Sequence, residues 1–107
     1  MAVLRGSTRN GGIAGGKAAI VRKPSDLKNT RIGNIVIVDS VDPKFISALF
    51  RASGILIEKE IDSPREALIA RQLSVPMVTG VSGARSRIKD GCFVTLNGNT
   101  GEVIFSE

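Results

Sequence analysis

Residues 35–57 read IVIVDSVDPKFISALFRASGILI, and this stretch decides the fold class. Ile35 to Val38 is a short, uniform run of β-branched residues, which predicts a strand buried on both faces. Asp42 and Pro43 have the residue types of a helix N-cap and a first helical residue, and Gly54 predicts the end of that helix. Strand character resumes at Ile55 to Ile57. The stretch therefore predicts a strand, a helix and a second strand.

The helix inside this stretch is expected to be amphipathic. Its large apolar side chains recur at helical spacing and are predicted to share one face, at Phe45, Ile46, Leu49 and Phe50. That face is expected to pack on the sheet.

The alternation of strands and helices continues on both sides. Ser63, Pro64 and Glu66 form a capping box, which predicts a second helix from there to about Leu73. Further strands are predicted at the β-like segments 17–21, 75–78, 92–96 and 102–105. The last two flank Asn97-Gly98-Asn99-Thr100-Gly101, a strong hairpin signal. The order predicts an α/β domain, a mixed sheet with packed helices and a C-terminal β-hairpin.

Composition limits the chemistry that the chain can perform. Its 107 residues and 11.3 kDa predict one domain over residues 1–107. The chain has no histidine, which excludes a Ser-His or Cys-His nucleophilic pair, a phosphohistidine and the usual His/Cys zinc site. We expect neither a metal nor a cofactor. With one cysteine and no apolar run long enough for a signal peptide or a membrane span, we expect a soluble, cytoplasmic protein.

The positive charge is concentrated in the N-terminal third. The net charge is +5, and residues 1–31 hold seven basic groups and one acid. The basic groups of this region are Arg5, Arg9, Lys17, Arg22, Lys23, Lys28 and Arg31. They could form a nucleic-acid-binding patch. However, no aromatic residue lies among them to stack on bases, so a solvated basic surface is the favoured interpretation.

Three other patterns have structural explanations. Gly11 to Lys17 spells G-x-x-x-x-G-K, but Ala18 follows where a phosphate-binding loop needs a hydroxyl for magnesium. Cys92 has no basic neighbour in sequence to lower its pKa and is predicted to be a small packing residue. Acidic residues gather around the second helix entry, at Glu58, Glu60, Asp62 and Glu66. For these we expect helix capping and surface solvation, not a metal site or an acid/base pair.

The order and spacing of short segments across almost the whole chain resemble the swivelling phosphohistidine domain of phosphoenolpyruvate-utilising enzymes. The matching segments are Gly12 to Lys17, Gly33 to Val36, Asp42-Pro43, Gly54 to Leu56, Ala70 to Gly80, Lys89 to Gly91, Val94 to Gly98 and Gly101 to Val103. The family includes pyruvate phosphate dikinase, phosphoenolpyruvate synthase, enzyme I of the sugar phosphotransferase system and an extra C-terminal domain of some pyruvate kinases. The resemblance implies a compact swivelling β/β/α domain whose phosphorylated histidine shuttles between two active sites.

The sequence departs from the family at the phosphorylation motif. The family carries Thr-x-x-Gly-Gly-x-x-Ser-His-x-Ala just before the pair that matches Ala70-Arg71. Counted back from there, the motif falls on Ile57, Glu60, Ile61, Pro64, Arg65 and Ala67, and only the alanine matches. Arg65 stands at the histidine position, and a guanidinium cannot act as a nucleophile toward phosphorus. The resemblance thus implies a family member without catalytic residues.

The altered motif leaves Ser63 and Arg65 at a helix N-terminus, an arrangement that can bind an anion. A phosphate, an acidic ligand or a partner's carboxylate would fit it. The competing interpretation is that Ser63 only caps the helix, while the neighbouring acids cancel the positive potential. Both interpretations stay open at the level of the sequence.

The resemblance leads us to expect a non-catalytic structural, docking or regulatory module, with protein partners of the dikinase or pyruvate kinase type. The alternative is a domain that still takes part in phosphoryl transfer, with Ser63 as acceptor or Arg65 holding a phosphorylated ligand. Nucleic-acid binding is a third hypothesis and would depend steeply on salt. The apolar run Val103 to Phe105 also predicts an exposed sheet edge available for pairing.

Overall fold

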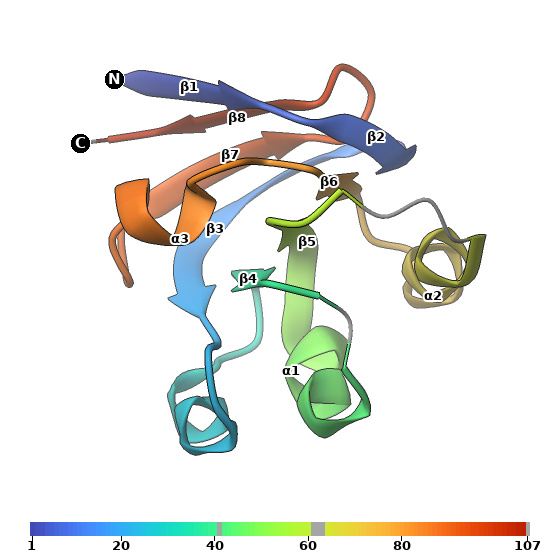
Figure 1. Cartoon of the computed structure of the whole chain (residues 1–107), viewed down its shortest axis with the longest axis vertical. Helices are drawn as coiled ribbons and strands as arrows, with labels where there is room; N and C mark the ends of the chain where they lie inside the picture. Colours follow the sequence, from blue (N-terminus) through green and yellow to red (C-terminus); the bar gives the residue numbers. More distant parts are fainter. Residues whose placement is uncertain (41, 61–63, 107) are drawn as a thin grey trace.

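Two layers of strands make up most of the molecule, and the described helices except the last in sequence form a third layer (Figure 1). The computed structural model of the chain describes residues 1–40, 42–60 and 64–106. The strands are β1 (Ala2–Arg5), β2 (Ser7–Asn10), β3 (Ile13–Ile20), β4 (Asn34–Val38), β5 (Ala52–Ile57), β6 (Met77–Thr79), β7 (Phe93–Asn97) and β8 (Glu102–Phe105). The helices are the 3-10 helices η1 (Pro24–Asn29) and η2 (Pro43–Phe45) and the α-helices α1 (Ile46–Arg51), α2 (Pro64–Leu73) and α3 (Ala84–Arg87).

The strands follow one another in the order β1-β8-β7-β3-β4-β5-β6-β2. Strands β3, β4, β5 and β6 run parallel to one another, whereas β1, β7 and β8 are joined antiparallel. β3 belongs to both layers, because residues 13–17 pair with β7 and residues 18–20 pair with β4. The α/β class, the mixed sheet and the hairpin β7–β8 confirm the fold that the sequence predicts.

Strand β4 shows why the β-branched run decides the fold. Ile35 and Ile37 lie in the inter-sheet core, the buried apolar cluster between the two strand layers. Val36 and Val38 lie in the helix-side core, the cluster between the parallel strands and the helices. Because side chains alternate across a strand, both faces of β4 are covered. The prediction of a strand buried on both faces is confirmed.

The first ten residues close the sheet upon itself, which the sequence analysis did not predict. β1 pairs with β8, and β2 pairs with β6 at the other end of the strand order. Gly6 joins β1 to β2, and its N–H donates to the carbonyl of Gly101 at 2.9 Å. The prediction that Val103 to Phe105 exposes a sheet edge is wrong, since β8 lies between β1 and β7.

The helix of residues 42–54 differs from its prediction. Asp42 caps its first turn, since its carboxylate accepts the N–H of Lys44 at 2.9 Å. This turn is 3-10, and α1 ends at Arg51 because Ala52 already belongs to β5. The prediction of a single buried apolar face is wrong, because Leu49 is buried whereas Phe50 is 70% exposed. A helix this short presents few positions to the sheet.

Of the remaining helices, α2 agrees with the helix predicted from the sequence, whereas η1 and α3 have no predicted counterpart. α2 spans Pro64–Leu73 as predicted, although Ser63, its expected N-cap, lies outside the described residues. The connection expected over residues 25–34 contains η1, and α3 was not predicted. Within residues 1–40, 42–60 and 64–106, no helix combines the length and apolar character needed to cross a membrane.

Candidate functional site

The residues that match the family's phosphorylation motif lie where β5 leaves the sheet and α2 begins. Ile57 is the last residue of β5, and Glu60 follows it in the connection. Arg65 is the second residue of α2 and is exposed. Of the two candidate anion-binding residues, only Arg65 is therefore described, because Ser63 lies outside the described part of the chain.

Glu60 is held by three side chains from two strands. Its Oε2 accepts a hydrogen bond from the Ser7 hydroxyl at 3.0 Å. Its Oε1 accepts from Arg9 Nη2 at 2.9 Å and from the Thr79 hydroxyl at 3.3 Å. We call these three donors and their carboxylate the Glu60 cluster. It lies beside the helix that carries Arg65.

The strand pairing explains how these donors meet. β2 and β6 pair antiparallel with Ser7 opposite Thr79. Arg9 lies at a register shift of β2 between Thr8 and Asn10, and its guanidinium reaches the same carboxylate as the Ser7 hydroxyl. The N–H of Gly80 donates to the carbonyl of Lys59 at 3.0 Å, which holds the end of β6 against the Glu60 segment. Two hydroxyls and a guanidinium are suitable hydrogen-bond donors for a bound oxyanion, but in this structure they donate to the carboxylate of Glu60.

A second group of charges follows the ends of β4 and β5. Arg85 Nε and Nη2 approach the carboxylates of Glu58 and Asp39 at 2.9 and 3.2 Å. Lys59 Nζ lies 3.2 Å from the other Asp39 oxygen. These charges offset one another, so the arrangement fixes α3 to the strand ends.

The acids around the helix entry are not simply solvated, which corrects the sequence prediction. The Glu58 side chain is 19% exposed and ion-paired with Arg85. Glu66 is 8% exposed on the first turn of α2, the place that a capping-box glutamate takes. Glu58 is held by Arg85, a partner distant in sequence that its local sequence does not reveal. Cys92, in contrast, packs against the inter-sheet core as predicted.

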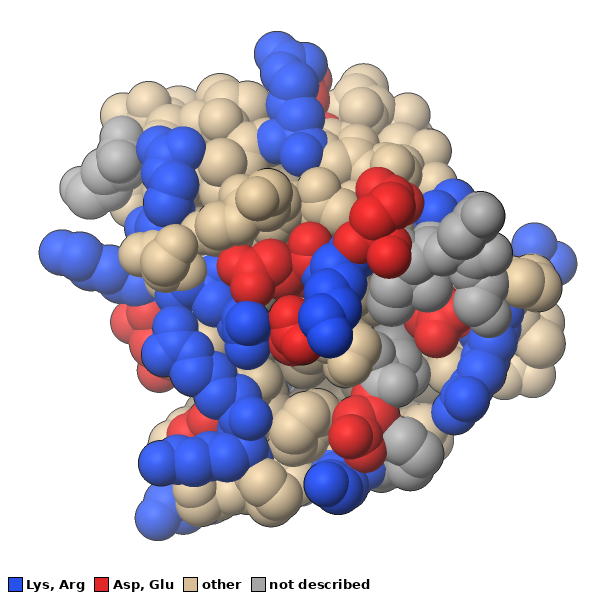
Figure 2. All heavy atoms as spheres, in the orientation of Figure 1, with Lys and Arg blue, Asp and Glu red and all other residues tan. Residues whose placement is uncertain are grey.

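The fold separates the basic residues of the N-terminal third. Arg5 pairs with Glu102 at 3.4 Å, and Arg9 pairs with Glu60 at 2.9 Å. Figure 2 shows blue side chains gathered on the left of the molecule, the side of η1 and α3, while red and blue alternate near the centre. Gly15 and Gly16 lie within β3, so the G-x-x-x-x-G-K pattern forms a strand.

The Glu60 cluster should contribute measurably to stability. We expect Glu60→Gln to lower the free energy of unfolding by about 1 kcal/mol, because it weakens one ion pair and two hydrogen bonds in a site that water partly screens. Urea unfolding monitored by circular dichroism measures this change. Glu102→Gln is the matched control, since its partner Arg5 is 74% exposed, and there we expect less than about 0.5 kcal/mol. Equal losses in both variants would contradict the role assigned to the cluster.

Comparison with known proteins agrees with this geometry. Residues 30–101 match the family model described as PEP-utilising enzyme, mobile domain. A probable phosphoenolpyruvate synthase of Methanothermobacter thermautotrophicus is 30% identical over 94% of the chain, and pyruvate kinase 2 of a Synechocystis species is 31% identical over 84%. The chain spans only 15% of the length of each of these relatives.

A solved structure supports the fold independently. The crystal structure of aconitase X from Thermococcus kodakaraensis, in its holo-form, matches with a TM-score of 0.72 and 22% identity, over all of this chain and all of the matched chain. At that identity the likeness shows the fold alone. The match to the family model covers most of the chain, including the β5–α2 connection and β7, and the chain therefore belongs to the mobile-domain family of phosphoenolpyruvate-utilising enzymes.

Proposed function

We propose that this chain is a non-catalytic mobile domain that docks on, and regulates, a phosphotransfer partner of the dikinase or pyruvate kinase type. The observation that carries the proposal is the absence of histidine from the sequence, with Arg65 at the position that matches the family's phosphorylated residue. A protonated guanidinium lacks the free nitrogen lone pair with which a neutral imidazole attacks phosphorus, so Arg65 does not replace the histidine as phosphoryl acceptor.

The geometry around this position supports the same conclusion. Glu60 stands where the family motif has a glycine, and its carboxylate engages Ser7, Arg9 and Thr79. A phosphoryl group arriving nearby would meet a fixed negative charge instead of open backbone. What the domain retains is an exposed surface, including Arg65, for contact with another protein.

The proposal predicts that no phosphoryl group is transferred to the chain. The purified protein is incubated with phosphoenolpyruvate, or with ATP, and a dikinase-type enzyme, and its intact mass is then measured. We expect an unchanged mass, while the histidine-containing mobile domain of a phosphoenolpyruvate synthase, treated in parallel, gains a phosphoryl group. A gain of mass on this chain would overturn the proposal. An acid-stable phosphoester mapped to Ser63 would then favour the alternative, that the serine serves as acceptor.

Docking requires its own test. Binding to purified phosphoenolpyruvate synthase and pyruvate kinase of the source organism is measured by isothermal titration calorimetry. We expect Arg65→Glu to weaken the complex about tenfold or more, because it reverses a charge at the surface that we assign to the interface. Arg71→Glu is the matched control, since this exposed residue lies in the last turn of the same helix and should retain affinity. Absence of binding to both enzymes would contradict the proposed partner class.

A further inference from the structure

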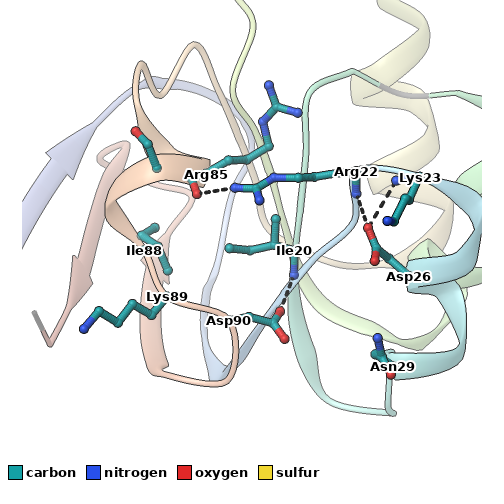
Figure 3. A pocket seen from close by; sticks show the side chains of 10 residues that line it. Ile20, Arg22, Lys23, Asp26, Asn29, Arg85, Ile88, Lys89 and Asp90 are labelled. Atoms are coloured by element: carbon teal, nitrogen blue, oxygen red, sulfur yellow. Dashed lines mark hydrogen bonds between the residues drawn. The ribbon is translucent and has the colours of Figure 1, made fainter.

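A hollow of about 570 Å³ opens between the end of β3, η1 and α3 (Figure 3). Its volume lies in the range of small-molecule sites in proteins. Ile20 and Ile88 form its apolar wall, and Arg22 extends across it. No residue of α2, β2 or β6 lines it, so it is separate from the Glu60 cluster and from Arg65. Ligands of α/β sheets tend to bind beyond the carboxyl ends of parallel strands, which is where this hollow lies relative to β3.

Three cations from two segments of the chain face this hollow. Arg22 follows β3, Lys23 precedes η1, and Lys89 follows α3. Within the described part of the chain, none of the three forms an ion pair. They differ in this from Arg85, which also lines the hollow but is bound by Glu58 and Asp39.

Arg22 is held in place by a single hydrogen bond. Its Nη2 donates to the carbonyl of Arg85 at 2.7 Å, which fixes the guanidinium across the hollow (Figure 3). A guanidinium has five N–H donors in a rigid fork, and such a fork matches the oxygens of a phosphate. Arg22 is thus positioned by the fold while most of its donors remain available to a ligand.

The two acids of the hollow are engaged by the backbone. Asp26 Oδ2 accepts the N–H of Arg22 at 2.9 Å and of Lys23 at 3.2 Å. Asp90 Oδ1 accepts the N–H of Ile20 at 2.8 Å. The hydrogen bond from the Arg22 N–H is the main cause that lowers the pKa of Asp26, so this carboxylate stays ionised and bound to the chain. The acids therefore shape the walls. Arg85 is neutralised by its own carboxylates, so the three remaining cations of the lining exceed the two acids by one charge.

We propose that this hollow binds a phosphorylated small molecule through Arg22, Lys23 and Lys89. Two neighbouring cations from the β3–η1 connection and one that follows α3 can contact a doubly charged phosphoryl group from two sides, and a singly charged carboxylate would satisfy them less well. The hollow is also much larger than one phosphate, so the rest of the molecule has room beside Asn29 and Ser86. This site goes beyond the proposed docking role, because it adds reversible ligand binding to a domain without a phosphoryl acceptor.

The test is an NMR titration of the isotope-labelled chain with phosphoenolpyruvate and ATP at constant ionic strength. Adenosine serves as the uncharged comparison. We expect saturable amide shifts within residues 20–29 and 85–90 for at least one phosphorylated compound, and none for adenosine. Absence of saturable shifts at millimolar concentrations of both compounds, or shifts centred on residues 64–66, would overturn the proposal.

Substitutions distinguish ligand binding at this site from non-specific attraction of anions to a basic surface. We expect Arg22→Gln and Lys89→Gln each to weaken binding about tenfold, since each removes charged hydrogen-bond donors from the ligand. Lys28→Gln is the matched control, because Lys28 is an exposed cation of η1 outside the lining, and it should leave the affinity unchanged. Equal weakening in all three variants would show non-specific charge attraction and would refute the site. This outcome is independent of the phosphorylation test, which detects a covalent group.

Discussion

Leu56→Ala is expected to lower the free energy of unfolding by about 4 kcal/mol, since it removes a fully buried side chain from a core that cannot collapse around the gap. Leu56 is 0% exposed and lies in the inter-sheet core. Its strand is paired on both sides, with Ile37 and Val78 as the neighbours in register. A domain of this size has roughly 5–15 kcal/mol of stability, so the variant should lose a large part of it.

Urea unfolding followed by circular dichroism measures this loss, with the slope of the transition compared between variants. Leu68→Ala is the matched control, because Leu68 is 50% exposed on α2. There we expect a loss below about 1 kcal/mol. Similar losses at the two leucines would show that the inter-sheet core does not dominate stability.

Gly6→Ala is expected to cost about 3 kcal/mol, because the added methyl group has no room at the junction that closes the sheet. A Cβ at Gly6 would meet the Thr79 carbonyl oxygen, with Val81 Cγ2 at 2.7 Å and Val78 Cγ1 at 2.8 Å. The oxygen belongs to the backbone of β6, so relief requires β1 or β2 to move. That movement would strain the hydrogen bond from Gly6 to Gly101 and the pairing with β8.

Gly33→Ala is the matched control, because it distinguishes the effect of steric crowding from the effect of backbone strain. Gly33 has φ +92°, a value that disfavours alanine, but a Cβ there would meet nothing within 4 Å. We expect this control to lose about 1 kcal/mol. Thermal unfolding of the two variants provides the comparison. A Gly33 variant less stable than the Gly6 variant would argue against tight closure of the sheet.

The elements predicted from sequence are those with a strong local pattern. The β-branched run of β4, the capping box of α2 and the turn of the β7–β8 hairpin each carry their own signal. β1 and β2 carry none, because residues 2–10 mix apolar, charged and small residues around a glycine. They become strands by pairing with β8 and β6, which are distant in sequence. For the same reason the sequence does not reveal that β1 covers the edge of β8.

The candidate site was predictable only in part. The resemblance located the altered motif at the start of a helix, and the structure places Arg65 there, exposed. The Glu60 cluster was missed because Ser7, Arg9 and Thr79 meet Glu60 only through long-range strand pairing. The spacing of Ser7 and Arg9 alone does not predict a shared face, because the register of β2 shifts between Thr8 and Asn10.

The pairing of β1 with β8 also governs when the domain can form. Ala2 lies opposite Phe105, so β1 finds its partner only after the residues between them have been synthesised. Contacts between residues so distant in sequence are slow to form, because the long intervening chain must first be ordered. The parallel strands can assemble earlier, each joined to the next through a short helix. Synthesis of β1 and closure of the sheet are therefore separate events, and closure waits for the four-residue strand β8.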